Sequence, residues 1–260
     1  MGEFSNKVVV VSGGSRGIGR AIAASFAREG AQTVLAAASQ ANLDAAASAV
    51  GNAGPGPLTF AGDLKTLQAC EALHAVVTEK LGRCDVLVNN AGATRSGNFL
   101  EMPDEAFHDG FALKYFACVR LSKLFWPMLK AAEGHVINII GGAARTPGAD
   151  FTIGGSVNAA MGNFSKSLSQ LGKKDGVNVN AIHPGVTDTE RLGELLDMRS
   201  RASGKSIDQL RAEATSKDGI RRIGTPADIA ALTLFLSSEK ARHIQGTAIA
   251  VDGGATAGYY

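Results

Sequence analysis

Residues 7–29 read KVVVV-SGGSRGIG-RAIAASFARE. The run at residues 7–11 is short and β-branched, which is typical of a buried parallel strand, and apolar residues recur at helical spacing from residue 20 onward. Between the two lies a glycine turn, which lets backbone N–H groups approach a phosphate at the N-terminus of the helix. By itself the glycine pattern also fits an ordinary tight turn before a helix. With its flanking strand and helix it predicts a site for the pyrophosphate of a dinucleotide.

Six further strands are expected after the first one. They alternate with helices along the chain, and such alternation implies right-handed crossovers and a parallel sheet. The expected strands are residues 33–37, 58–61, 86–89, 135–140, 178–183 and 248–251. The predicted fold class is α/β: a single-domain Rossmann fold over residues 1–260, with a doubly wound seven-stranded parallel sheet flanked by helices.

Charge and composition exclude several classes of function. The 260 residues carry a net charge of +2 and contain three Cys and five His. This charge is too small to indicate nucleic-acid binding, and the Cys and His lack metal-ligand spacing, so no metal is expected. Neither a signal peptide nor an apolar run of membrane-spanning length is recognisable. We therefore expect a cytoplasmic protein that acts on a small molecule, without nucleic-acid or membrane partners.

Four more motifs follow expected strands. They are Asp63-Leu64, Leu87-Val88-Asn89-Asn90-Ala91-Gly92, His183-Pro184-Gly185-Val186-Thr187-Asp188-Thr189 and Val251-Asp252-Gly253-Gly254. Together with the glycine turn, these motifs resemble the short-chain dehydrogenase/reductase family, especially its members similar to bacterial 3-oxoacyl-carrier-protein reductases. The resemblance extends over nearly the full length of the chain. It implies hydride transfer between a nicotinamide dinucleotide and a carbonyl or alcohol carbon.

The resemblance also implies which residues bind the dinucleotide. It assigns Asp63 to the adenine, Asn90 and Gly92 to the ribose side, and Val186 and Thr189 to the carboxamide. The full expected set is Gly13, Ser15, Arg16, Gly17, Ile18, Gly19, Ser39, Asp63, Leu64, Asn90, Ala91, Gly92, Pro184, Gly185, Val186 and Thr189.

The end of the second strand indicates which dinucleotide is preferred. Sites that select NAD(H) usually hold the adenosine ribose with an acidic residue there, but this strand ends Ala37-Ala38-Ser39. Arg16 in the glycine turn is placed to pair with a 2′-phosphate, and Ser39 could hydrogen-bond to it. NADP(H) is therefore expected in preference to NAD(H), although Ala38 stands where many NADP-binding relatives carry a second Arg.

The residues that perform the family's chemistry are absent. Family members use a Tyr to transfer the proton, a Lys to lower the pKa of that Tyr, a Ser to position the substrate oxygen and an Asn to anchor a water relay. The only Tyr residues are Tyr115, Tyr259 and Tyr260, and none of them has a Lys four positions later. A Tyr-x-x-x-Lys pair therefore cannot be drawn in any alignment.

Four other residues stand at these positions. The run at residues 162–168 fixes the register of the helix, and counting back from it puts Gly154 at the Tyr position and Asn158 at the Lys position. Gly141 stands at the Ser position and Lys114 at the Asn position. Two replacements empty space, and the other two look exchanged between helices that face each other in this family.

Lys114 and Asn158 are therefore the candidate catalytic residues. We expect Lys114 to fill part of the emptied volume and to contact a cofactor ribose, an ordered water or an anionic ligand. The alternative is that Lys114 extends to solvent and that Asn158 is a neutral helix residue.

Four functions remain open at this point. The first is an atypical NADP(H)-dependent oxidoreductase in which Lys114, or a water that it holds, replaces the Tyr. The second is a catalytically inactive cofactor-binding pseudoenzyme that acts as a sensor or partner subunit, and the third is a non-redox enzyme that uses the emptied pocket. In the fourth, the tail at residues 255–260 carries a Tyr into a neighbouring subunit's site. We favour the first, because every cofactor-contacting position remains chemically sensible.

Two further regions are expected to contribute to substrate binding and assembly. Residues at about 186–220 should form a variable helical flap over the substrate. Its Leu and Arg side chains fit a hydrophobic or an anionic substrate, or simply an amphipathic flap with a solvated face. The expected long helix at residues 104–130 is rich in aromatic residues. This richness and the family resemblance predict a homotetramer or, failing that, a homodimer.

Overall fold

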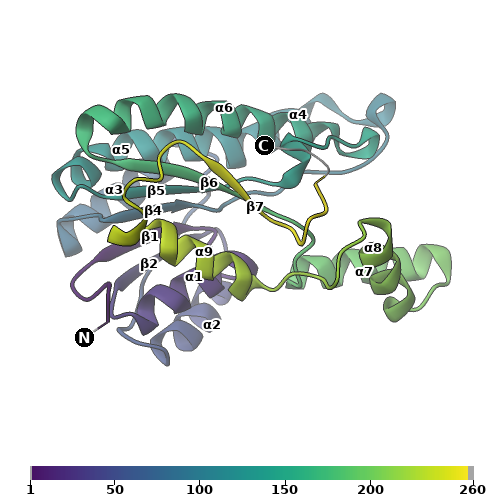
Figure 1. The fold of residues 1–260 in the computed structure, drawn as a ribbon, viewed down its shortest axis with the longest axis horizontal. Helices are drawn as coiled ribbons and strands as arrows, with labels where there is room; N and C mark the ends of the chain where they lie inside the picture. The colour runs from purple at the N-terminus through teal and green to yellow at the C-terminus, as the bar shows by residue number, and fades with distance from the viewer. Residues whose placement is uncertain (1, 257–260) are drawn as a thin grey trace.

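Seven parallel strands form one sheet between two layers of helices in the computed structural model, which describes residues 2–256 (Figure 1). The strand order is β3-β2-β1-β4-β5-β6-β7, so the chain reverses its winding direction between β1 and β4. In such sheets, ligands bind beyond the carboxyl ends of the strands near this reversal. The strands are β1 (Val8–Ser12), β2 (Gln32–Ala37), β3 (Leu58–Ala61), β4 (Val86–Asn89), β5 (His135–Ile139), β6 (Asn178–Pro184) and β7 (Ala248–Val251).

These strands agree with the sequence-based expectation to within one residue at each end. The predicted fold class is confirmed. Short β-branched and apolar runs form the central strands because both faces of the sheet are covered, and every residue of β1, β4 and β5 is buried.

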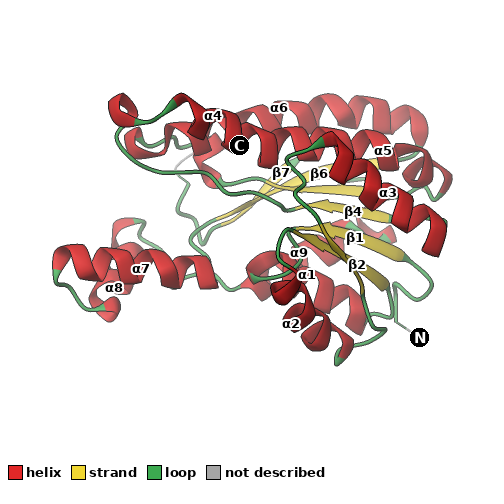
Figure 2. Ribbon diagram, turned by 180° about the vertical axis from the view of Figure 1, so that it is seen from behind, coloured by secondary structure: helices red, strands yellow, loops and turns green. Residues whose placement is uncertain are grey.

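Helices cover each face of the sheet, as Figure 2 shows. Val9 and Val11 of β1 pack with Phe26 in the core on one side, whereas Val10 packs with Phe125 in the core on the other, because alternate strand residues point to opposite faces. The helices of the first face are α1 (Gly17–Arg28), α2 (Gln40–Gly51) and α9 (Pro226–Leu236), and those of the second are α3 (Leu67–Leu81), α4 (Asp104–Gly110), α5 (Ala117–Ala131) and α6 (Thr152–Asp175). Among the described helices, none is long and apolar enough to cross a membrane.

The helix expected at residues 104–130 is interrupted in its middle. After α4 the chain forms a π-helical segment, Phe111–Phe116, before α5 begins. A π-helical segment holds one extra residue per turn and is frequent at functional sites. Lys114 lies inside this segment.

Two helices project from the carboxyl ends of the strands, in the region where the flap was expected (Figure 1). They are α7 (Glu190–Ser203) and α8 (Ile207–Lys217). The two ends of this segment are joined: the Asp188 amide donates to the Gly224 carbonyl over 2.8 Å, and the Gly224 amide donates to the Val186 carbonyl over 2.9 Å. The flap therefore leaves and rejoins the body of the protein at one point.

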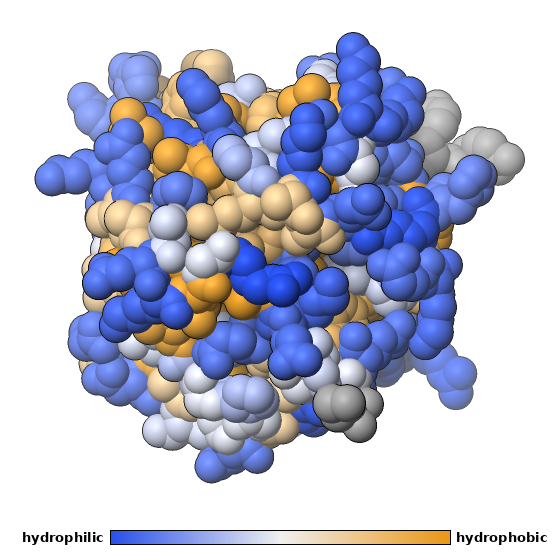
Figure 3. All heavy atoms as spheres, turned by 90° about the vertical axis from the view of Figure 1, so that its left-hand side faces the viewer, coloured by the Kyte–Doolittle hydropathy of each residue, from blue (hydrophilic) through white to orange (hydrophobic). Residues whose placement is uncertain are grey.

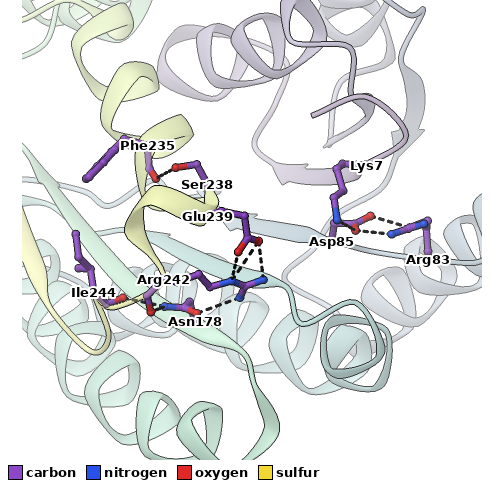
Figure 4. Close-up of polar contacts among 9 residues, drawn as sticks. All are labelled: Lys7, Arg83, Asp85, Asn178, Phe235, Ser238, Glu239, Arg242 and Ile244. Carbon is purple, nitrogen blue, oxygen red and sulfur yellow. Dashed lines mark hydrogen bonds and ion pairs between the residues drawn. The ribbon is translucent and has the colours of Figure 1, made fainter. Parts of the chain in front are cut away.

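Charged side chains tie the strands together at their amino ends. The buried Asp85 carboxylate accepts a hydrogen bond from the Val8 amide at 2.9 Å. It also accepts hydrogen bonds from the Arg83 guanidinium and pairs with Lys7 at 3.1 Å (Figure 4). These contacts join the start of β1 to the start of β4.

The side of the molecule away from α7 and α8 shows hydrophilic side chains around smaller hydrophobic areas (Figure 3). A cavity of only about 60 Å³ lies at this amino edge, so a dinucleotide must be accommodated elsewhere.

Candidate active site

A cavity of about 610 Å³ lies at the carboxyl ends of β1, β4, β5 and β6. Its volume falls within the usual range for small-molecule sites, and it stands where the winding of the sheet reverses. Three of the four residues at the lost tetrad positions, Lys114, Gly141 and Asn158, line it. The expected dinucleotide-binding residues in the lining are Gly13, Ser15, Arg16, Gly17, Ile18, Asn90, Ala91, Gly92, Pro184, Gly185 and Thr189.

Five expected dinucleotide-binding residues lie outside this lining. Ser39 and Asp63 follow the carboxyl ends of β2 and β3, on the side where the adenine was expected. The Ser39 hydroxyl oxygen caps α2 by accepting a hydrogen bond from the Asn42 amide at 3.3 Å, and an Asp63 carboxylate oxygen accepts from the Lys65 amide at 3.1 Å. The other three are Gly19, Leu64 and Val186, of which Gly19 and Leu64 are buried.

The glycine turn is shaped for close approach. Gly13 has a φ of 66°, and a Cβ added to it would lie 2.9 Å from the Ala91 Cα. A Cβ on Gly19 would overlap the Gly13 carbonyl oxygen. The Asn90 side-chain amide donates to that oxygen over 3.0 Å and so joins the loop after β4 to the turn. The residues present therefore fit a dinucleotide phosphate, because close packing holds the turn in place and its glycines carry no side chains that would block the backbone N–H groups.

Two acidic side chains of α7 already contact this turn. The Gly17 amide donates to a Glu190 carboxylate oxygen over 3.0 Å, and Arg20 pairs with Glu190 at 2.6 Å. Arg16 pairs with Glu194 at 2.9 Å. Burial tends to raise the pKa of Glu190, but backbone N–H groups and Arg20 outweigh it and hold this pKa below its usual range. The Gly17 amide and Arg16, which were expected to bind phosphate, thus bind carboxylates in this structure.

An aromatic ring occupies the place of the missing Tyr side chain. A Cβ added to Gly154 would overlap the ring of Phe151, which lies just before the first residue of α6. Phe151 lines the cavity, whereas Gly154 does not. The ring carries no hydroxyl, so this position supplies an apolar wall and cannot donate a proton.

The lost Ser and Lys positions are filled together. The Asn158 side-chain oxygen accepts a hydrogen bond from the Gly141 amide at 3.0 Å, and a Cβ on Gly141 would lie 2.7 Å from the Asn158 side-chain nitrogen. His183 Nδ1 lies 3.2 Å from the Gly141 carbonyl oxygen, which accepts a hydrogen bond when this nitrogen carries the hydrogen. Burial, the largest influence, lowers the pKa of His183. Asn158 and His183 therefore hold the backbone of Gly141 from both sides, and Asn158 does not replace the lost Lys charge.

Lys114 supplies a cation to the cavity from the opposite wall. Its aliphatic stem covers Gly92, where an added Cβ would lie 2.9 Å from the Lys114 Cδ. Burial, reinforced by the nearby Arg191 guanidinium, lowers the pKa of the Lys114 ammonium from 10.5 to about 8, although Cys118 opposes the shift. Lys114 therefore lines the cavity, whereas Asn158 and Phe151 stand where the Cβ atoms of the missing Ser and Tyr would be.

The Tyr residues do not take over the missing role within the described part of the chain. Tyr115 packs among the rings of Phe111, Phe116 and Phe164 and is not part of the cavity lining. The tail residues Tyr259 and Tyr260 lie outside residues 2–256.

Phe151, Glu190 and Glu194 are site residues that sequence analysis did not assign. Phe151 could have been found from its spacing, because a Gly three positions later in a first helical turn leaves room for a bulky ring. Glu190 follows directly on the expected carboxamide contact Thr189, but no spacing rule aims its carboxylate back at the glycine turn. In residues 2–256, no group of three or more His, Cys, Asp or Glu side chains could hold a metal ion.

Several known proteins are similar to this chain. An uncharacterized oxidoreductase of Mycobacterium tuberculosis is 32% identical over 98% of this chain and 94% of that protein. The 3-oxoacyl-[acyl-carrier-protein] reductase of Escherichia coli is 33% identical over 97% of this chain and 98% of that protein. The crystal structure of L-sorbose reductase from Gluconobacter frateurii, complexed with NADPH and L-sorbose, superposes with a TM-score of 0.95 at 32% identity and covers 100% of this chain and 99% of that chain.

The family model described as enoyl-(acyl carrier protein) reductase matches residues 13–256, which contain the glycine turn, the cavity and the flap. The chain belongs to the short-chain dehydrogenase/reductase family.

Proposed function

We propose that this chain is an NADP(H)-dependent oxidoreductase that reduces a carbonyl group and in which Lys114 takes the place of the family's Tyr. The observation that carries the proposal is the position of Lys114. Its side chain lines the same cavity as the glycine turn, and its stem rests on Gly92, one of the expected ribose-side residues.

Lys114 is suited to giving up a proton. An ammonium group with a pKa of about 8 is mostly protonated at neutral pH and is a stronger acid than an ordinary lysine. When bound, a reduced nicotinamide supplies the hydride that the carbonyl carbon accepts. Lys114 would donate its proton to the carbonyl oxygen and regain one from water. A positioned general acid contributes about 10²–10⁴ in rate, so this one residue can supply a large part of what the Tyr would.

The preference for NADP(H) rests on the end of β2 and on Arg16. No carboxylate follows β2 to repel a 2′-phosphate, and the Ser39 hydroxyl hydrogen is available because its oxygen is the capping acceptor. Arg16 can release Glu194 and bind a phosphate instead, since both side chains of this ion pair are exposed to solvent and such pairs are weak. Three structural neighbours, an L-sorbose reductase, a reductase of bacilysin biosynthesis and a polyketide ketoreductase, are described with NADPH or as NADPH dependent.

Titration with NADPH and NADH, followed by a panel of aldehydes and ketones, tests the proposal. We expect tighter binding of NADPH, consumption of NADPH with at least one carbonyl, and a loss of about 10²–10⁴ in kcat in Lys114→Met with little change in NADPH affinity. Lys123→Met is the matched control, because Lys123 is exposed on the neighbouring helix α5. Failure of both nucleotides to bind, or full activity in Lys114→Met, would refute the proposal.

A cofactor-binding pseudoenzyme is the second candidate. The observation that favours it is the pair formed by Phe151 and Gly154, which leaves no hydroxyl at the Tyr position. Tight binding of NADPH without consumption in any carbonyl reaction would select this candidate. Turnover without a change in NADPH absorbance would instead indicate non-redox chemistry in the same pocket.

The assembly that we propose is a homotetramer. Phe116 next to α5 and Leu171 on α6 are large apolar side chains that are 45% and 44% exposed in the single chain. Contacts between subunits would cover them. Light scattering on the purified protein tests this, and a monomer or a dimer would contradict it.

A further inference from the structure

Two cationic side chains converge on one residue of the cavity wall, Gly92. The stem of Lys114 lies over its Cα, as the 2.9 Å between an added Cβ and the Lys114 Cδ shows. From the flap helix α7, the Arg191 guanidinium donates to the carbonyl oxygens of Gly92 at 3.4 Å and Thr94 at 3.1 Å. All four of these residues line the cavity. The fixed wall and the flap thus each contribute one positive charge to the same corner.

No carboxylate in the described part of the chain balances these two charges. The acidic side chains of the cavity lining, Glu190 and Glu194, are engaged by Arg20 at 2.6 Å and Arg16 at 2.9 Å. Within residues 2–256, Lys114 and Arg191 form no ion pair, and the Lys114 ammonium makes no hydrogen bond. Two like charges that face one cavity repel each other, and each loses part of its hydration. A bound anion offsets both unfavourable free-energy terms by attracting the two charges.

The structure assigns Lys114 and Arg191 as a paired anion site, and we propose that the substrate is an oxo acid whose carboxylate is bound by Arg191 while its ketone oxygen faces Lys114. This inference rests on the proposed function and adds its substrate class. Arginine suits a carboxylate because its planar fork can donate two parallel hydrogen bonds, and Arg191 has N–H groups left after its two backbone contacts. The Phe151 ring provides an apolar surface for the carbon chain.

The reaction balances without any further group. The ketone carbon accepts a hydride from the reduced nicotinamide, and the electron pair of the carbonyl bond moves to the oxygen. That oxygen takes the proton of Lys114, which is then replaced from water. The product is a hydroxy acid with the same charge as the oxo acid, so the carboxylate contact to Arg191 is kept throughout.

Pairs of substrates that differ only in charge test the inference. We would compare 2-oxobutyrate and acetoacetate with their ethyl esters as substrates, using NADPH consumption by the wild-type protein, Arg191→Gln and Arg199→Gln. Arg199 is the matched control because it is exposed on the same helix and does not line the cavity. As a readout independent of turnover, we would titrate the protein without nucleotide with oxamate, an unreactive oxo-acid analogue, by calorimetry.

We expect the wild-type protein to prefer at least one acid over its ester by up to about fivefold in kcat/KM, as one exposed charge pair allows. Arg191→Gln should remove that preference mainly through KM and weaken oxamate binding by up to about fivefold, whereas Arg199→Gln should change neither. An equal or greater activity with the ester overturns the inference. So does oxamate binding that is absent, or that Arg191→Gln leaves unchanged.

The two readouts separate the inference from the proposed function. Oxamate binding that depends on Arg191, with no consumption of NADPH in any carbonyl reaction, would overturn the proposed function and keep the anion site. Consumption of NADPH with uncharged carbonyls, together with an oxamate affinity that is the same in the wild-type protein and in Arg191→Gln, would support the proposed function and overturn the anion site.

Discussion

Replacing Lys114 with Met should stabilise the fold near neutral pH. Lys114 lies in a π-helical segment with its stem on Gly92, and burial and the Arg191 charge together lower its pKa to about 8. A lowered lysine pKa means that folding disfavours the charged form. Met keeps an unbranched stem of similar length, so the substitution removes the charge and retains most of the packing on Gly92.

The size of the effect follows from the pKa. A fall from 10.5 to about 8 corresponds to about 3 kcal/mol of folding free energy at 1.36 kcal/mol per tenfold change. This free energy is an upper limit, because part of the Lys114 side chain is exposed to solvent and water screens its charge. The unfolded chain binds more protons at this site than the folded chain between about pH 8 and 10.5, so wild-type stability rises with pH across that window. The advantage of Lys114→Met is therefore full below about pH 8 and disappears toward pH 10.5.

Urea unfolding of both proteins at a series of pH values measures this difference directly. We expect a gain of up to about 3 kcal/mol near pH 7 that shrinks as the pH rises, with Lys123→Met close to wild type throughout. A variant that is less stable than wild type near pH 7, or a difference that does not depend on pH, would refute the burial of a charged Lys114.

Three further predictions follow from the same contacts. Glu190→Gln should tighten NADPH binding about fivefold in an equilibrium titration, because the Gly17 amide and Arg20 lose a competing anion worth about 1 kcal/mol; an unchanged or weaker affinity would count against this competition. Gly154→Ala should destabilise the fold by about 1–3 kcal/mol through overlap with the Phe151 ring, and adding Phe151→Ala should recover part of that loss in urea unfolding; additive losses would show that the two residues do not touch. Carbonyl reduction should slow about tenfold per pH unit above about pH 8, as Lys114 loses the proton that it must donate; a flat kcat profile to higher pH would exclude Lys114 as the acid.

Much of this architecture could be predicted because local patterns determine it. The β-branched run before Gly13 and the helical spacing after Gly19 identify β1 and α1 without tertiary information. The remaining strands follow from alternating apolar runs and turns. The long helix predicted at residues 104–130 was less accurate, because it contains a π segment around Lys114. An extra residue in a helical turn leaves no periodic signal in so short a stretch.

The filling of the emptied Ser position could not be predicted from motif spacing, whereas the filling of the Tyr position had a signal in the three-residue spacing of Phe151 and Gly154. Gly141 and Gly154 were interpreted as vacated space, yet Asn158 and the Phe151 ring occupy the places where their Cβ atoms would stand. The contact between Asn158 and Gly141 joins α6 to the loop after β5, and both contacts depend on rotamers that the sequence does not specify. The carboxylate of Glu190 at the glycine turn is likewise a contact between segments far apart in the chain.

The most direct test of the account follows a labelled hydride. Wild-type protein and Lys114→Met would be incubated with NADPH deuterated at the transferred position and with a panel of ketones and oxo acids, and the products analysed by mass spectrometry. The account predicts an alcohol that carries one deuterium with the wild-type protein and a yield lower by about 10²–10⁴ with Lys114→Met. Products without deuterium, or equal labelled yields from both proteins, would contradict it.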